Sequence, residues 1–193
     1  MKIRPSARII VTAPGDEALA QRPVTLHEIN ALDQPAFVAR LGALFEDSPW
    51  IAAFAWHTRP FASRDALYQA LCQIMYGASE ERQLALIQAH PDLVGRAALA
   101  GTLTTESTRE QAAAGLDHLS PDEIATFSRL NAAYRERFDF PFVICARENK
   151  KASILGGFTT RLKHSQSEEI QIALGEIAKI ARLRLHDAVA ADE

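Results

Sequence analysis

Few features of this sequence mark a specialised class of protein. It has only two cysteines, Cys72 and Cys145, which lie in apolar runs without metal-ligand spacing, so buried free thiols in a reducing compartment are the simplest interpretation. No apolar run reaches the roughly 18 to 20 residues that span a bilayer. The N-terminus lacks the continuous apolar core of a signal peptide. We therefore expect a cytoplasmic protein with no membrane partner.

A charge excess of one sign is also missing. The chain of 193 residues has 21 basic and 24 acidic residues, for a net charge of -3, and both signs are spread along it. Nucleic acids and anionic membrane surfaces attract strongly basic patches, so we expect neither as a partner. The 48% of hydrophobic residues are enough for a sizeable core. One domain is the default at this length.

Residues 1–23 differ from the rest of the chain because prolines and a glycine interrupt them, at Pro5, Pro14, Gly15 and Pro23. We expect an N-terminal tail there, either partly disordered or docked on the body of the protein. From residue 24 to residue 193, apolar residues recur with helical spacing, and several serines stand where they can cap helices. These serines are Ser48, Ser63, Ser79, Ser120 and Ser165. The sequence predicts an all-α single domain of about seven to eight helices.

One segment, residues 140–146, breaks the helical period. It is short, apolar and partly β-branched, which is typical of extended chain, and Pro141 argues against a central strand. Without a sheet to pair with, its backbone N–H and C=O groups need partners on helices, on water or on a ligand. A ligand that binds backbone groups is therefore one interpretation of this segment.

A histidine at a predicted helix end is the first candidate for chemistry. Pro91 disfavours helical geometry for the residue before it, so a helix should end near Ala89 and His90. The negative end of the helix dipole should raise the pKa of His90, which suits a proton donor near neutral pH. The alternative is a histidine that satisfies terminal carbonyls or faces solvent.

A carboxylate and two arginines are the next candidates. Ser107-x-x-Glu110 has the form of a capping box, in which the glutamate bonds back to the N-cap N–H. A carboxylate held in this way is rigid enough to orient an imidazole, and Gln111 adds an amide. Arg184 lies on the apolar side of the last helix, where a guanidinium needs an acid or a bound anion. Arg161 is a weaker candidate of the same kind.

The sequence lacks the residues that other kinds of functional site require. His90-x-Asp92 offers two metal ligands, but no third cluster is visible, so we expect no metal. Gly156-Gly157 follows no strand and is no phosphate-binding loop, and there is no nucleophile elbow. A non-catalytic helical binding module and a metal-dependent hydrolase are the competing classes.

Motifs along most of the chain resemble one known family. They are Leu41-Gly42-x-Leu44-Phe45-Glu46-x-Ser48-Pro49-Trp50, Arg59-Pro60-Phe61, Ala89-His90-Pro91-Asp92-Leu93, Ser107-Thr108-Arg109-Glu110-Gln111, Ala114-Gly115-Leu116-Asp117, Leu130-Asn131-x-x-Tyr134, Phe138-x-Phe140-Pro141-Phe142-Val143-Ile144 and Leu183-Arg184-Leu185. Each motif alone is weak, but their order and spacing are specific. From about residue 25 to about residue 187, the chain resembles 2-oxo-4-hydroxy-4-carboxy-5-ureidoimidazoline (OHCU) decarboxylase.

The resemblance implies an all-α carboxy-lyase without a cofactor, usually a homodimer. Such an enzyme converts OHCU to (S)-allantoin and CO2, the third step of urate degradation. Loss of CO2 leaves an electron pair, and the ring C=N of this substrate can accept it without pyridoxal or a metal. We expect His90 to be the acid–base group, Glu110 and Gln111 to hold substrate N–H groups, and Arg184 to bind the anionic substrate or to fix the glutamate.

The resemblance also assigns site residues by position. It implies catalytic roles for His90, Glu110 and Arg184, with Arg161 as the alternative arginine. Substrate contacts are implied for Pro91, Ser107, Thr108, Arg109, Glu110, Gln111, Phe142, Val143, Ile144, Cys145 and Ala146. One departure from the family's pattern is Lys163-His164, where an asparagine is expected after the Arg-Leu pair, and it concerns only a helix terminus.

Overall fold

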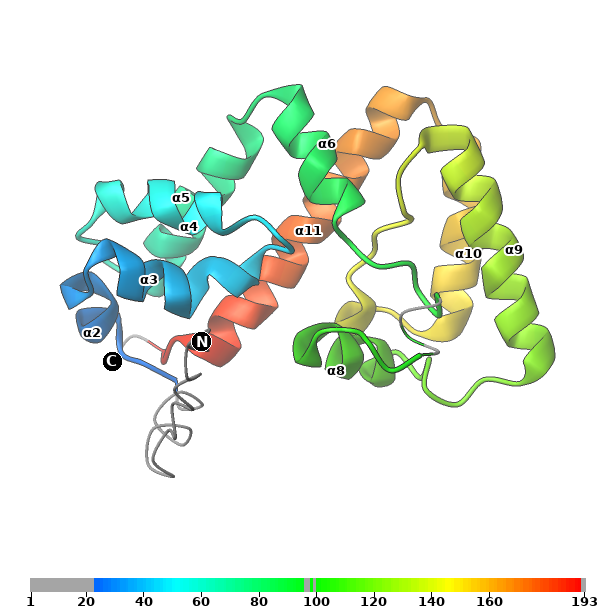
Figure 1. Cartoon of the computed structure of the whole chain (residues 1–193), viewed down its shortest axis with the longest axis horizontal. Coiled ribbons are helices and arrows are strands. Elements are labelled where there is room, and N and C mark those ends of the chain that lie inside the picture. Colours follow the sequence, from blue (N-terminus) through cyan, green and yellow to red (C-terminus); the bar gives the residue numbers. More distant parts are fainter. Residues whose placement is uncertain (1–22, 96–97, 99, 192–193) are drawn as a thin grey trace, which may run out of the picture.

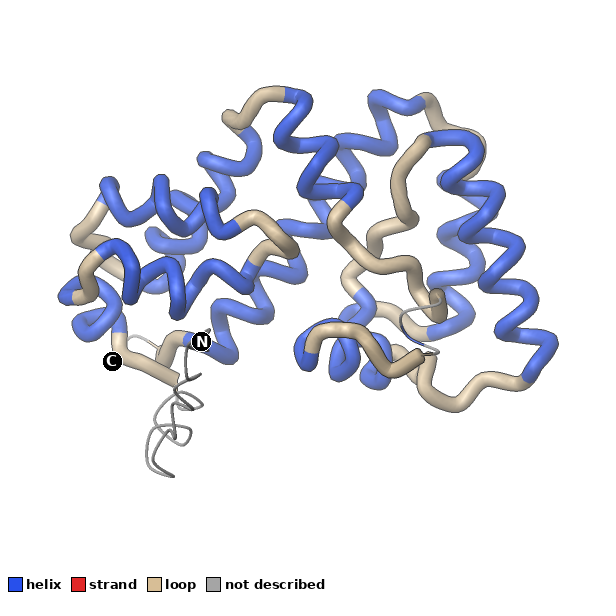
Figure 2. Tube along the Cα trace, viewed as in Figure 1, coloured by secondary structure: helices blue, strands red, loops and turns tan. Residues whose placement is uncertain are grey.

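Helices and their connecting loops make up the described part of the chain, which comprises residues 23–95, 98 and 100–191 of a computed structural model (Figure 1). The predicted tail at residues 1–23 lies outside it except for Pro23. In chain order the elements are α2 (Leu26–Ala31), α3 (Gln34–Leu41), η1 (Gly42–Leu44), α4 (Pro49–Ala55), η2 (Trp56–Thr58), α5 (Arg64–Tyr76), α6 (Glu80–Gln88), α8 (Thr105–Ala113), α9 (Pro121–Phe138), η3 (Ala146–Glu148), α10 (Lys151–Arg161) and α11 (Gln166–Ala188). Among these residues there are helices but no strand, which confirms the all-α prediction (Figure 2).

The helix starts follow the local capping signals. Ser120 and Ser165 each form a complete capping box with the glutamate three residues on. Ser63 and Ser79 accept the N–H of the third helical residue, whereas Ser48 makes no such bond and α4 begins on Pro49. All five predicted starts are therefore confirmed.

Two boundaries differ from the predicted pattern. The helical spacing of Phe37, Leu41, Leu44 and Phe45 predicts one face of a single helix, but α3 ends at Leu41 and a 3-10 turn follows. Phe45, at the end of that turn, is nevertheless buried. The sequence also predicts a helix from Ser153 to Leu162 that Gly156-Gly157 interrupts, whereas α10 runs from Lys151 to Arg161.

Helix α11 runs through the middle of the molecule, with α2 to α5 on one side and α8 to α10 on the other (Figure 1). It packs against α3, α5, α6 and η1. Ile170, Leu174, Ile177, Ala181 and Leu185 recur at helical spacing and are all buried. A side chain on α11 can therefore reach both halves of the protein.

An aromatic cluster anchors the extended segment to α9 and α10. The Phe142 ring stacks on Phe158 with 3.8 Å between ring centroids, and Tyr134 meets Phe142 edge-on at 5.2 Å. A Cβ on Gly157 would lie 3.2 Å from the Phe142 ring, so a larger residue here would press on this ring. The Gly156-Gly157 pair thus lies within a continuous helix rather than interrupting it.

Both cysteines, Cys72 and Cys145, are free and buried. Within the described residues, no helix combines the length and the apolarity needed to cross a membrane.

Candidate active site

His90 lies just beyond the C-terminal end of α6, as the sequence predicts. Its Nδ1 lies 2.9 Å from the Leu86 carbonyl oxygen. A carbonyl only accepts, so Nδ1 carries the hydrogen and Nε2 keeps the lone pair of the neutral ring. Burial lowers the pKa of His90 to about 4, so the ring is neutral near pH 7. The predicted increase in this pKa is wrong, because the loss of hydration outweighs the hydrogen bond to the Leu86 carbonyl oxygen and the Glu46 charge.

Glu110 on α8 and Arg184 on α11 form a two-pronged ion pair. Arg184 donates from Nε to one Glu110 oxygen and from Nη2 to the other, both at 2.8 Å. Burial disfavours the charged guanidinium, but hydrogen bonds and charges from Glu110 and Glu46 outweigh it and raise the pKa of Arg184. The arginine that the sequence placed on the apolar side of the last helix therefore has a buried acid as its partner.

The capping-box interpretation of Ser107 and Glu110 is wrong. Helix α8 begins three residues earlier than that motif requires, with Thr104 as its N-cap. The Thr104 side chain accepts the Ser107 N–H at 3.2 Å, so Ser107 and Glu110 both lie inside the helix. Several hydroxyl residues precede Glu110, and the local pattern alone did not identify the one that caps.

Glu46 is a member of this cluster that the sequence reasoning missed. It follows η1, and its Oε1 accepts hydrogen bonds from Ser107 Oγ at 2.9 Å and from Arg184 Nη2 at 3.0 Å. Glu46 belongs to one of the motifs that carry the family resemblance, but nothing in its local pattern indicates a partner on α8 or α11.

A small cavity of about 40 Å³ lies among these side chains. From the end of α6 and from α8, it is lined by His90, Pro91, Ser107, Glu110 and Gln111. From the extended segment, η3 and α11, it is lined by Phe142, Val143, Ile144, Ala146 and Arg184. Glu46 also lines it. Segments far apart in the sequence thus converge on one cavity that holds polar side chains against an apolar wall.

Three of the predicted site residues lie outside this cavity. Thr108 is exposed, and its hydroxyl donates to the Thr104 carbonyl oxygen at 2.9 Å. Arg109 lines a separate, open cleft of about 760 Å³, which also has Glu110 and Arg184 in its wall. Cys145 is buried, and burial raises the pKa of its thiol to about 11. Their assignment to substrate binding stays a prediction.

Several backbone groups of the extended segment bond to neighbouring side chains. The Val143 carbonyl oxygen accepts from Arg161 Nη1 at 2.7 Å. The Cys145 N–H donates to Glu176 at 2.8 Å, and the Cys145 carbonyl oxygen accepts from Asn149 at 3.0 Å. Helices therefore satisfy part of this backbone, one of the alternatives that the sequence left open.

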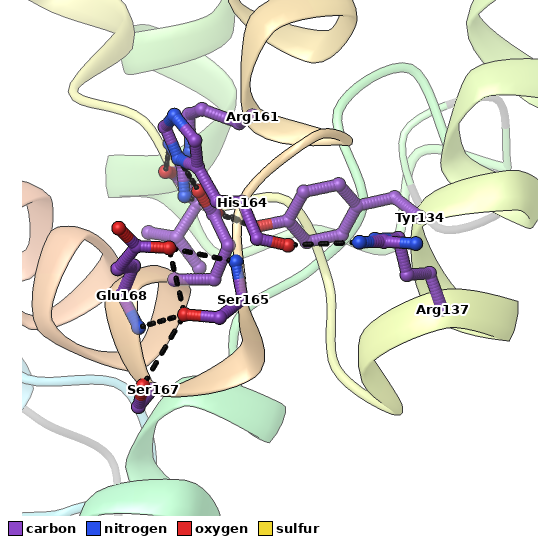
Figure 3. A network of polar contacts seen from close by, with 9 residues as sticks. Tyr134, Arg137, Arg161, His164, Ser165, Ser167 and Glu168 are labelled. Carbon is purple, nitrogen blue, oxygen red and sulfur yellow. Dashed lines mark hydrogen bonds and ion pairs between the residues drawn. The ribbon is translucent and has the colours of Figure 1, made fainter.

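Arg161 belongs to a second buried network, away from His90. Its Nε donates to Glu169 at 2.8 Å and its Nη2 donates to the Tyr134 hydroxyl at 3.1 Å. The Tyr134 hydroxyl in turn donates to Glu169, and His164 Nδ1 lies 2.6 Å from the other Glu169 oxygen. Figure 3 shows Arg161, His164 and Tyr134 converging in this network. Of the two candidate arginines, Arg184 is the one beside Glu110 and the cavity.

The two residues considered as metal ligands do not act together. Arg135 Nε donates one bifurcated hydrogen bond to the two Asp92 oxygens, at 2.9 and 3.0 Å, so Asp92 has a protein partner. No group of three or more histidine, cysteine, aspartate or glutamate side chains that could hold a metal occurs within the described part of the chain.

A neutral histidine beside a buried carboxylate–guanidinium pair, on an all-α scaffold, is an arrangement typical of acid–base enzymes. Sequence comparison identifies the family. Residues 30–186 match the family model described as OHCU decarboxylase, and the chain belongs to that family.

Relatives and solved structures agree with this membership. The chain is 44% identical over 162 residues to the OHCU decarboxylase of Haloferax volcanii, which covers 84% of this chain and 94% of that protein. It is 41% identical over 164 residues to that of Halalkalicoccus jeotgali, with 85% and 91% covered. A crystal structure of (S)-allantoin synthase superposes with a TM-score of 0.68 at 25% identity, over 86% of this chain and 54% of that one.

Proposed function

We propose that this chain is a carboxy-lyase that decarboxylates OHCU to (S)-allantoin and CO2, the third step of urate degradation. The observation that carries the proposal is the convergence of His90, Glu110 and Arg184 on one cavity. Relatives that bear the name of this activity, at 41% and 44% identity over most of their length, support it.

The reaction sets three tasks for the site. Breaking the bond between the ring carbon and the carboxylate releases CO2, and the electron pair moves into the ring C=N. The anionic substrate becomes a neutral product, so one proton is consumed, while the ring hydroxyl loses its proton as it becomes a carbonyl. The protein must bind the anion, move protons and protect one face of the ring, since the product is a single enantiomer.

The residues around the cavity fit these tasks. His90 carries the proton chemistry, because its Nδ1 is bound to Leu86 and its Nε2 is left for the substrate. Arg184 supplies the positive charge for the anion, and Glu110 fixes that guanidinium and accepts substrate N–H groups. Gln111 Oε1 accepts the Val94 N–H at 3.0 Å, which leaves its amide N–H groups for the ligand.

The cavity must widen to admit this substrate. A volume of about 40 Å³ is close to the roughly 30 Å³ that one water occupies, and OHCU is several times larger. We propose that the substrate enters from the open cleft, whose wall shares Glu110 and Arg184 with the cavity.

The direct test generates OHCU in solution from urate and follows the circular dichroism of allantoin after the protein is added. The proposal expects faster formation of the (S) enantiomer than in the protein-free reaction, unchanged after dialysis against a chelator because no metal or other cofactor takes part. Equal rates with and without protein would rule out this activity.

The assembly and location of the enzyme are part of the same proposal. Following the family resemblance, we propose a homodimer, which light scattering on a size-exclusion column would detect as twice the chain mass of 21.2 kDa. A monomer mass would refute it. We also propose a cytoplasmic location, which two buried and unpaired thiols support. Fractionation of cells that express the full chain would check it.

A further inference from the structure

The charges around the cavity do not cancel. Arg184 is positive, Glu110 and Glu46 are acidic, and the neutral His90 ring adds no charge. The wall therefore carries one negative charge more than positive charges. Under the proposed function the substrate brings another negative charge into this space, and the reaction consumes a proton there.

We propose that Glu46 is a positioning residue of this site, which orients Arg184 and Ser107 through one oxygen and whose charge stabilises the protonated form of His90 while the anionic substrate is bound. The inference rests on the proposed decarboxylation and adds to it the source of stabilisation for the proton that is consumed.

The contacts of Glu46 suit both parts of this role. Its Oε1 accepts from Ser107 on α8 and from Arg184 on α11, so it ties together the two helices that carry the site. Within the described residues, Glu46 Oε2 makes no hydrogen bond, so one oxygen of this carboxylate is left without a protein partner. Glu110, in contrast, gives both oxygens to Arg184.

The loop holds Glu46 in a fixed place where its charge acts strongly. Phe45 before it is buried, and Asp47 after it has a φ of 42°, in the left-handed region that turns the chain sharply. The Glu46 side chain is only 11% exposed, so water and salt screen its charge weakly. A partly buried charge in a fixed position exerts a larger field on its neighbours than a mobile surface charge.

The other charges near His90 do not provide this stabilisation in its place. Asp47 is exposed, and Glu110 is neutralised by Arg184, whose own charge opposes a second cation. Asp92 is paired with Arg135. On α11, Glu176 is paired with Lys179 and bound to the Cys145 N–H. Burial lowers the pKa of His90, and Glu46 opposes this more strongly than Arg184 promotes it.

The protons balance in this scheme. His90 takes up one proton from water as the substrate carboxylate enters. After CO2 has left, the nitrogen and the carbon of the former ring C=N each gain a proton: His90 supplies one, and the other replaces the proton that the ring hydroxyl gives up. Glu46 itself neither gives nor accepts a proton in this scheme. Without the Glu46 charge the protonated His90 is less stable, so the enzyme should fail first at high pH, where protons are scarce.

The test is the pH profile of kcat for Glu46→Gln. Glutamine keeps a carbonyl oxygen for Ser107 and Arg184 but removes the charge. We expect the alkaline limb of kcat to move down by about one pH unit, with a loss of about tenfold at pH 8 and a much smaller loss at pH 6. The matched control is Glu123→Gln, which removes an equal charge from the start of α9, remote from the cavity. Its profile should coincide with that of the wild type.

A uniform loss of kcat at every pH, or an alkaline limb that does not shift, would overturn the inference and leave Glu46 with a structural role only.

Thermal unfolding establishes that each variant is folded. Where Glu46→Gln does not fold, Glu46→Asp replaces it, since aspartate keeps the charge while shortening the reach to Ser107 and Arg184. A lower kcat of Glu46→Asp, with the alkaline limb at the same pH as in the wild type, supports the role of the charge. An alkaline limb displaced from that pH overturns it. A wild-type protein that does not accelerate the formation of (S)-allantoin would refute the proposed function itself, and this result is distinct from the two outcomes above.

Discussion

Two buried arginine–glutamate pairs lie in the C-terminal half of this protein, and they differ in what surrounds them. Arg161 and Glu169 have other internal partners, namely the Tyr134 hydroxyl, His164 and the Val143 carbonyl oxygen. The Arg161 guanidinium also lies 4.3 Å from the centroid of the Phe142 ring. This network is enclosed by aromatic side chains that fill the space around it.

The pair of Arg184 and Glu110 lies at a cavity instead. Beside it, His90 Nε2 and one Glu46 oxygen keep hydrogen-bonding capacity that the described protein residues do not use. A buried ion pair by itself therefore does not mark a functional site. Unused polar capacity next to a cavity does, because a ligand can complete it.

The same histidine substitution, made once in each network, should show the largest difference in turnover between the two networks. His90→Asn keeps a donor for the Leu86 carbonyl oxygen but removes the acid–base group, so we expect kcat to fall by about 10²- to 10⁴-fold. His164→Asn removes a contact whose histidine is 30% exposed, so we expect turnover per folded molecule within about twofold of the wild type. Allantoin formation measures both, and a His90→Asn enzyme of wild-type rate would contradict the assignment.

Equal arginine substitutions should separate the two networks in stability. Arg161→Met leaves the Glu169 charge fully buried without its partner, which should lower the free energy of unfolding by about 3–5 kcal/mol. Arg184→Met should lower the free energy of unfolding by less, because Glu46 and Glu110 line a cavity where water can hydrate them. Urea unfolding monitored by circular dichroism measures both losses. The reverse order would contradict the distinction drawn between the two networks.

The neutral state of His90 should make stability depend on pH. Its pKa is about 4 in the folded protein and 6.5 in the unfolded chain, so the unfolded chain binds the proton first as pH falls. The stability that comes from the unprotonated ring is complete above pH 6.5. About 3 kcal/mol of it is lost between pH 6.5 and pH 4. The free energy of unfolding of His90→Asn should fall less steeply over this range, and equal slopes would show that His90 does not contribute.

Substitutions at two neighbouring glycines should have the smallest effects. They test the packing around the second network. The added methyl group of Gly157→Ala would lie 3.2 Å from the Phe142 ring, which is itself stacked on Phe158, so we expect destabilisation of about 1 kcal/mol. Gly156→Ala meets nothing within 4 Å and should stabilise the helix by about 0.5–1 kcal/mol. Thermal unfolding measures the Tm of both variants. Equal changes in Tm would mean that the Phe142 ring is free to move.

The sequence predicted best what local interactions decide. Helix starts at Ser63, Ser120 and Ser165 were found because a cap and its partner lie within three residues of each other. The extended segment was found because residues 140–146 lack helical spacing, although only the residues up to Cys145 are extended and Ala146 begins η3. Burial of Arg184 followed from its place on the apolar face of a long helix.

What the sequence did not predict depends on contacts between distant residues. Thr104 caps α8 in place of Ser107, and the Ser107 hydroxyl instead binds Glu46, which is remote in sequence. The pKa of His90 falls because other segments cover the ring, which a helix-end pattern cannot reveal. The boundary of the N-terminal tail at residue 23 stays a prediction.

The most direct test compares Glu110→Gln with Glu169→Gln, one substitution in each network, in the allantoin assay. Each neutralises a buried carboxylate that is bound to a buried arginine. We expect Glu110→Gln to stay folded and to lose about 10²-fold or more in kcat. We expect Glu169→Gln to lose stability while its folded fraction turns over at close to the wild-type rate. A Glu110→Gln enzyme of wild-type turnover, beside a folded but inactive Glu169→Gln enzyme, would contradict the placement of the reaction at the His90 cavity.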